Sequence, residues 1–271
     1  LDPQFSKAFY NMANTFFALG DTAAAIDIYK KSIALKPEFA PAANNLGAAY
    51  LKAGQISEAF QSFARALRLN PQYEEAFANL YNLSIQCPWQ RREFSKLKKR
   101  IQPFSGVKTH LLALIDAYIE QDSTSVQAEL SALKLAERGN AFNALSAADR
   151  IFCLAYYNLI QALEAQNKGF MSNKSDGSET RLIYHLGESH CLSFAHLKLR
   201  LEGQMYKVQP VISFGTKVFH LSDAVQRPFS EILRAQLRHL PKHSKVMLSF
   251  GEIDCRLHEG FLAVAEARNI N

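Results

Sequence analysis

Hydrophobic and polar positions over residues 1–84 repeat with a period of 34. Each unit holds two stretches with apolar residues at helical spacing, separated by a turn and closed by a proline. Small residues at fixed positions allow helices to cross closely, and large ones fill the space between units. The pattern predicts helix–turn–helix units, two complete and the first helix of a third. The matched sets are Met12, Leu46 and Leu80; Phe16 and Tyr50; Gly20 and Gly54; Ala25 and Ala59; Tyr29 and Phe63; Ser32 and Ala66; and Pro3, Pro37 and Pro71.

This pattern resembles the tetratricopeptide repeat, a helix pair that stacks into a solenoid. The resemblance implies a protein or an extended peptide as partner. The sixth position of each unit is an asparagine: Asn11, Asn45 and Asn79. Their spacing is similar to the asparagine ladder of O-GlcNAc transferase repeats, which implies carboxamides that hold a peptide backbone through a donor and an acceptor. The alternative is that asparagine is simply common at this position.

The first residues, Leu1-Asp2-Pro3, match the tail of a preceding repeat, so we expect the natural protein to extend further at its N-terminus. The repeats are expected over residues 1–86. Pro88 then breaks their register, and helices are expected at 90–100, 110–120, 125–138 and 147–166 as a helical extension over residues 87–167. Residues 168–180 are polar, with glycine, serine and threonine, and indicate a linker.

After the linker the pattern changes to alternating strands and helices, which predicts a parallel sheet with helices on its faces over residues 181–271. Strands are expected at 181–187, 206–215 and 245–250. Helices are expected at 191–202, 229–240 and 260–267. In the second of these helices Ile232, Leu233, Ala235 and Leu237 are expected to face inward. Ser189, Gly215 and residues 251–254 fall at the C-terminal strand ends, where such sheets bind ligands.

Three short blocks in this region resemble the SGNH/GDSL hydrolases, in the expected order. They are Gly187-Glu188-Ser189, residues 212–215 (ISFG) and residues 246–254 (VMLSFGEID). The resemblance covers about the last third of the chain and implies a three-layer α/β domain. It also implies ester hydrolysis or acyl transfer, with an acylated glycan or a small ester as substrate. Ser189 would be the nucleophile, Gly215 an oxyanion donor, and Gly251 and Asp254 members of the third block.

The resemblance departs from the family at two places. Ile253 stands where the family has an asparagine donor, and the Asp-x-x-His block that supplies the base is absent. We therefore expect the domain to be incomplete in this chain. Ser189 has an alternative role as a helix N-cap. Two other functions stay open. The first is a non-catalytic binding scaffold with a degenerate or truncated hydrolase domain. The second is part of a glycosyltransferase with tetratricopeptide repeats, because Cys87-Pro88-Trp89 resembles the Cys-x-Trp at the end of the repeats in some such enzymes.

Composition narrows the remaining choices. A hydrophobic content of 48% with 21% charged residues is typical of a globular protein. The net charge of +6 comes partly from a basic cluster within residues 91–100, which indicates a solvated helix face rather than a nucleic-acid surface. Aromatic residues are not interleaved in the way that binders of single-stranded nucleic acid need. Nucleic acid is therefore not expected as a partner. A membrane is not expected either, because no run approaches the ~20 apolar residues of a membrane span.

The four cysteines are widely separated, which predicts reduced thiols and a cytoplasmic protein. No motif indicates a cofactor. A zinc site is not expected, because the candidate ligands lack a tight pair spacing. These candidates are His190, Cys191, Asp254, Cys255 and His258.

Overall fold

The computed structural model describes residues 3–101, 104–166, 181–201, 203–214 and 228–249. Its contacts form two compact units. The described residues within 1–103 and 218–239 make the first unit, and those within 104–217 and 240–271 make the second. Whether the ranges 1–86, 87–167 and 181–271 fold as separate domains stays a prediction.

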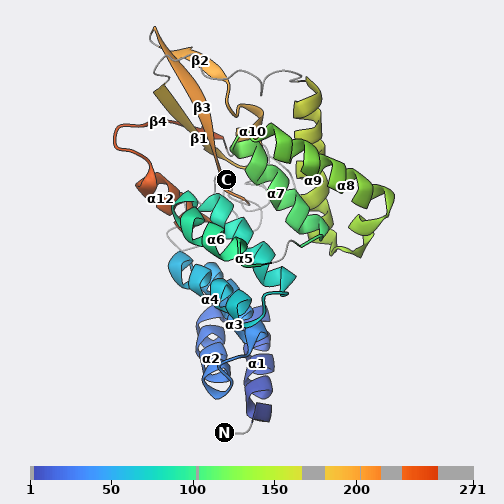
Figure 1. Ribbon diagram of the computed structural model, residues 1–271. Helices are drawn as coiled ribbons and strands as arrows, with labels where there is room; N and C mark the ends of the chain where they lie inside the picture. The colour runs from blue at the N-terminus through green and yellow to red at the C-terminus, as the bar shows by residue number, and fades with distance from the viewer. Residues whose placement is uncertain (1–2, 102–103, 167–180, 202, 215–227, 250–271) are drawn as a thin grey trace, which may run out of the picture. The chain divides into compact units, whose positions relative to one another are not determined.

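Five helices of the first unit follow the 34-residue period of the sequence (Figure 1). The helix α4 begins and ends 34 residues after α2, and α5 bears the same relation to α3. Gly20 and Gly54 take φ angles of +86° and +75° in the turn within each helix pair, a conformation that favours glycine. The predicted repeat architecture is therefore confirmed. The helices are α1 (Pro3–Ala18), α2 (Thr22–Leu35), α3 (Ala40–Lys52), α4 (Ile56–Leu69) and α5 (Glu74–Gln86).

The matched residues of α2 and α4 lie in the core of the repeats, whereas Met12 of α1 is 40% exposed. Ala25 and Ala59 are fully buried, and the rings of Tyr29 and Phe63 are each 1% exposed. A Cβ on Gly47 would lie 2.7 Å from the Phe63 ring, so glycine allows α3 and α4 to pack at this distance. The periodic residues thus set the crossing of each helix pair.

Beyond α5 the first unit contains a 3-10 turn, η1 (Pro88–Gln90), a basic helix, α6 (Arg91–Lys98), and a helix from the C-terminal part, α12 (Pro228–His239). The Gln236 side chain donates from Nε2 to the Gln86 carbonyl oxygen at 2.8 Å. The His239 ring stacks on Trp89, with centroids 3.8 Å apart. Leu237 is 42% exposed, so the prediction that it faces inward is wrong; Gln236 is buried instead.

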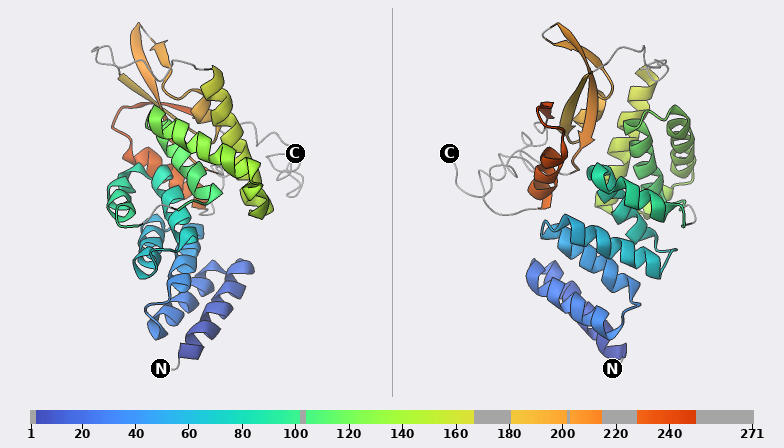
Figure 2. Two further views of the ribbon diagram at one scale, coloured as in Figure 1. Left: turned by 45° about the vertical axis from the view of Figure 1, so that its right-hand side comes forward. Right: turned by 60° about the vertical axis from the view of Figure 1, so that its left-hand side comes forward.

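The second unit begins with helices that pack on one another (Figure 2). Helix α7 (Val107–Ile119) contacts both α8 (Ser123–Arg138) and α9 (Ala147–Gln166), and a 3-10 turn, η2 (Ala141–Ala144), joins the last two. Leu111, Leu112, Leu114 and Ile115 of α7 are all fully buried, because this helix is enclosed on several sides. At the start of α9 the Asp149 N–H donates to Ser146 Oγ at 3.1 Å, which is the predicted helix start.

A four-stranded mixed sheet completes the second unit, with strand order β2-β3-β1-β4. Strand β1 pairs in parallel with both β3 and β4, whereas β2 pairs antiparallel with β3. The prediction of a wholly parallel sheet is therefore corrected to a mixed sheet. The elements are β1 (Arg181–Gly187), α10 (His190–Ser193), β2 (Lys198–Leu201), β3 (Gln204–Ile212) and β4 (Lys245–Ser249).

The helix expected at 191–202 is wrong beyond Ser193, where α10 ends. His196 takes a φ of +65°, which a helix does not allow, and the next residues form β2. Gly203, at φ +77°, lies in the turn between β2 and β3. Because β2 gains a complete set of pairs on β3, tertiary pairing outweighs the helical spacing of the apolar residues.

Candidate functional site

A set of hydrogen bonds between asparagines joins the first helices of the repeats. The Asn45 Nδ2 group donates to Tyr10 Oη at 3.1 Å and to Asn14 Oδ1 at 3.0 Å. The Asn79 Nδ2 group donates to Asn44 Oδ1 at 3.1 Å. Asparagine at the sixth position thus bonds to the residue at the fifth position of the preceding repeat, in both pairs of neighbouring repeats. These bonds fix one repeat on the next.

Asn44 is the centre of this network and is 1% exposed. Its Nδ2 group donates to Asn45 Oδ1 at 3.2 Å and to Glu75 Oε1 at 3.3 Å. The Tyr29 hydroxyl extends the network by donating to Asn14 Oδ1 at 2.6 Å. Burial raises the pKa of Tyr29 to about 12, so this hydroxyl stays protonated and remains a donor at neutral pH. The network is therefore neutral apart from Glu75.

The three predicted ladder residues differ in the hydrogen bonds that they can still offer. Asn45 uses both of its N–H donors inside the network and keeps only acceptor capacity. Asn79 uses one N–H and keeps a second donor and its carbonyl oxygen. Asn11 is exposed, and its side chain has no hydrogen-bond partner among the described residues. Asn11 and Asn79 can therefore still donate and accept at once.

Sequence reasoning missed the residues that hold this network together. Asn14, Asn44 and Glu75 lie at other positions of the repeat than the ladder, so the 34-residue spacing does not single them out. The adjacent pair Asn44-Asn45 was the available signal, because two neighbouring carboxamides on an otherwise apolar helix need partners.

Ser189 follows β1 and is half-buried, with φ −51° and ψ −32°. Its side chain makes no capping hydrogen bond, so the N-cap alternative is not what this residue does here. The helix after it, α10, spans only four residues, and the expected long helix with its dipole is absent. Any stabilisation of an anion at Ser189 would thus come from local groups.

Gly187 sets the distance between β1 and β4 beside Ser189. A Cβ at this position would lie 2.6 Å from both the carbonyl oxygen and the Oγ of Ser249. The Gly187 carbonyl oxygen also accepts a bond from the Ser213 N–H at 2.8 Å, at the end of β3. The C-terminal ends of the three parallel strands therefore meet at Gly187.

A second serine, Ser249, lies at this edge with a histidine. His185 Nε2 is 2.7 Å from Ser249 Oγ, and the His185 ring, 1% exposed, meets the Phe194 ring edge-on. This separation is within the range of a nucleophile–base pair. No motif in the sequence singles out Ser249. The alternation of β1 puts His185 and Gly187 on one face, and the pairing of Gly187 with Ser249 brings His185 and Ser249 together.

Two further polar groups lie near this edge. Cys191 is fully buried, and burial raises the pKa of its thiol far above the usual range, so it is not a thiolate nucleophile at neutral pH. Burial, and then the Glu188 carboxylate, raise the pKa of Tyr156 well above 10. The Tyr156 hydroxyl is buried, and it neither donates nor accepts a hydrogen bond within the described part of the chain.

The other predicted hydrolase residues, Gly215, Gly251 and Asp254, lie outside the described residues, as does Ile253. The same holds for Asp254, Cys255 and His258 of the candidate zinc set. Within the described ranges, no three histidine, cysteine or acidic side chains are grouped so that they could hold a metal ion. None of the helices that the structure describes has the length and apolarity to cross a membrane.

Comparison with known families adds one match. The tetratricopeptide repeat model matches residues 16–83. No curated protein matches the chain. The match covers the helices whose ends repeat every 34 residues, and it includes Asn45 and Asn79. Residues 16–83 are thus similar to tetratricopeptide repeats, the helical scaffolds whose concave faces bind other proteins.

Proposed function

We propose that this chain is a protein-binding scaffold in which α1, α3 and α5 hold an extended peptide. The observation that supports this is the unequal use of the three asparagines. Asn11 and Asn79 keep both donor and acceptor groups, and Asn45 keeps an acceptor, at equivalent positions on the first helices of successive repeats. An extended peptide offers backbone N–H and C=O groups at regular intervals, which a carboxamide can bind in pairs.

The hydrogen-bond network favours this role because it fixes the helices that carry the asparagines. Asn44 and Asn45 are each bonded to residues of other helices, so the spacing of the first helices does not have to be established on binding. A surface that is ordered before binding loses less conformational entropy in the complex.

Replacing Asn11 and Asn79 together by alanine is expected to weaken peptide binding at least 10-fold, because each truncation removes a donor and an acceptor. The ligand is a peptide selected on the 271-residue protein from a library of unstructured 12-residue peptides. Affinity is measured by calorimetric titration.

The matched control is Asn143→Ala, an exposed asparagine in η2 of the second unit. It should leave the affinity unchanged within twofold. Asn45→Ala is compared separately, because it breaks bonds to Tyr10 and Asn14 and so also affects stability. If the Asn11, Asn79 double variant binds as tightly as the unaltered chain, the asparagines do not hold the peptide.

As a second candidate function, we propose that the strand-bearing region is an SGNH-like three-layer domain that cleaves or transfers acyl groups, with an acylated glycan or a small ester as substrate. The order of its parallel strands supports this proposal: the second, first and third strands in sequence lie side by side as β3-β1-β4. Flavodoxin-like sheets begin with this order and bind ligands at the same edge. Ser189 lies at that edge, and the buried Tyr156 hydroxyl, near Glu188, is an additional donor.

A fluorophosphonate probe tests this second candidate, since it labels only an activated serine. Labelling should disappear in Ser189→Ala and persist in the matched variant Ser249→Ala. Both are assayed in the 271-residue chain. Loss of labelling in Ser249→Ala alone would assign the reactive serine to the His185 pair, and absence of labelling in the unaltered chain would contradict serine hydrolysis by this domain.

A further inference from the structure

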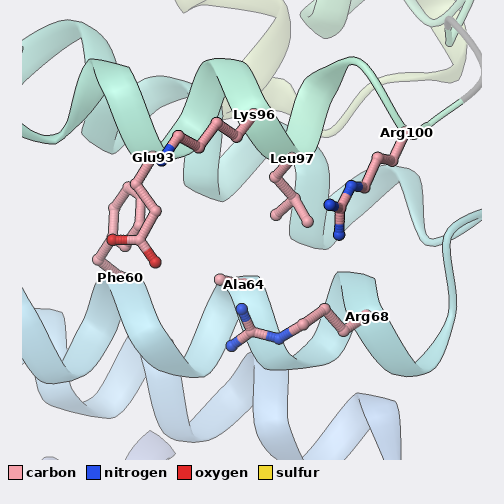
Figure 3. A pocket seen from close by; sticks show the side chains of 7 residues that line it. All are labelled: Phe60, Ala64, Arg68, Glu93, Lys96, Leu97 and Arg100. Carbon is pink, nitrogen blue, oxygen red and sulfur yellow. The ribbon is translucent and has the colours of Figure 1, made fainter.

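The first unit contains a small pocket between α4 and α6, and no asparagine of the network lines it (Figure 3). Its volume is about 160 Å³, similar to the ~150 Å³ cavity that holds a benzene molecule. Residues three and four apart on each helix form its walls, as expected for one face of a helix. The lining residues are Phe60, Ala64 and Arg68 of α4, and Glu93, Lys96, Leu97 and Arg100 of α6 and the turn after it.

The floor of the pocket is apolar. Phe60 and Ala64 are each 1% exposed, and Leu97 is half-buried opposite them. These side chains pack α4 against α6 and keep their positions fixed. A group that enters the pocket therefore meets carbon atoms at the bottom and charged groups at the rim.

The charged groups at the rim are three cations and one carboxylate. Arg68 extends from α4 and Arg100 from the turn after α6 toward the same end of the pocket, and Glu93 lies at the other end beside Phe60 (Figure 3). The Glu93 carboxylate accepts a weak bond from Gln61 at 3.5 Å. Within the described residues, the side chains of Arg68, Lys96 and Arg100 have no ion pair or hydrogen bond.

Neighbouring basic residues of the same unit do have partners. Arg65 donates to the Pro37 carbonyl oxygen at 2.8 Å, and Lys98 donates to the Tyr81 hydroxyl at 3.2 Å and lies over its ring. The cations of the pocket thus differ from those that serve the fold. Their charge is available to a ligand.

We propose that this pocket binds an oxyanion group, a carboxylate or a phosphoryl group, on a side chain of a protein partner. Two guanidinium groups at one end can each bind such a group through paired N–H bonds. The apolar floor accommodates the methylene groups that carry the anion. The only aromatic ring of the pocket, Phe60, is buried and cannot stack on a nucleotide base, which argues against single-stranded nucleic acid.

The test uses short glycine–serine peptides with glutamate, phosphoserine or glutamine at the centre, titrated into the 271-residue protein and followed by NMR. The two anionic peptides should shift the amide signals of α4 and α6 in a saturable way, and the glutamine peptide should bind at least 10-fold more weakly. Arg68→Gln combined with Arg100→Gln should lower the affinity for the anionic peptides at least 10-fold.

The matched control is Arg92→Gln combined with Lys99→Gln, which removes the same charge from exposed positions outside the pocket lining. It should change the affinity less than twofold. Fluorescence of Trp89, the single tryptophan, reports whether the first unit remains folded in each variant.

Three results would overturn the proposal. The first is absence of saturable binding by both anionic peptides. The second is an equal loss in the pocket variant and its control, which would indicate general charge attraction. The third is tighter binding of inorganic phosphate or of a single-stranded oligonucleotide than of the peptides, which would assign the pocket to a free anion or to nucleic acid.

Discussion

Replacing Gly187 by alanine is expected to lower the free energy of unfolding of the second unit by about 3 kcal/mol, at the upper end of overpacking effects. The new Cβ would lie 2.6 Å from the Ser249 carbonyl oxygen, which belongs to the backbone of β4 and cannot rotate away. The β1–β4 pairing must therefore shift. The measurement is native-state hydrogen exchange of the amides in β1 and β4.

The matched control for this substitution is Gly139→Ala in the same unit. A Cβ there would meet nothing closer than 3.5 Å, and the Gly139 φ angle of −81° suits alanine. Its effect should stay within about 0.5 kcal/mol. Equal exchange in both variants would contradict the close approach of β1 and β4.

Acidification is expected to destabilise the second unit through His196, which is 5% exposed. Burial, with a smaller effect of the Lys207 charge, lowers the pKa of His196 from 6.5 to about 4, although the bond between Nε2 and the Tyr118 carbonyl oxygen acts in the opposite direction. The unfolded chain therefore takes up a proton near pH 6.5, whereas the native state takes it up only near pH 4. The contribution of His196 to the free energy of unfolding is fully present above pH 6.5, and about 3 kcal/mol of it is lost as the pH drops to 4.

The matched variant is His196→Asn, because asparagine tolerates the φ of +65° and does not titrate. The free energy of unfolding, measured by hydrogen exchange of amides in β1 and β3, should fall between pH 6.5 and 4 in the unaltered chain. The variant should lose about 3 kcal/mol less over this interval. The same pH dependence in both proteins would show that other groups cause it.

The helices of the first unit were predictable because each repeat buries the same positions against its neighbours. Ala25, Tyr29 and their partners 34 residues later are buried as the pattern indicates. Sequence reasoning also found the asparagines of the ladder. It could not find that Asn45 is internally bonded, because that depends on Asn14 and Tyr10, which the packing of α1 on α3 brings close.

The C-terminal part was predicted less well because its elements depend on pairing rather than on local pattern. Residues 198–201 have helical apolar spacing but form a strand on β3. The buried face of α12 packs within the first unit, where Gln236 finds the Gln86 carbonyl oxygen, and this explains why Leu237 remains exposed. The His185–Ser249 pair likewise arises from the register of β1 on β4, which no spacing in the sequence reveals.

The most direct test of the peptide-binding proposal is photo-crosslinking with the selected 12-residue peptide carrying a benzophenone group at successive positions. If α1, α3 and α5 hold the peptide, mass spectrometry should find crosslinks within residues 3–18, 40–52 and 74–86, in an order that follows the peptide. Crosslinks confined to residues 104–166 or 181–214 of the second unit would contradict the proposal.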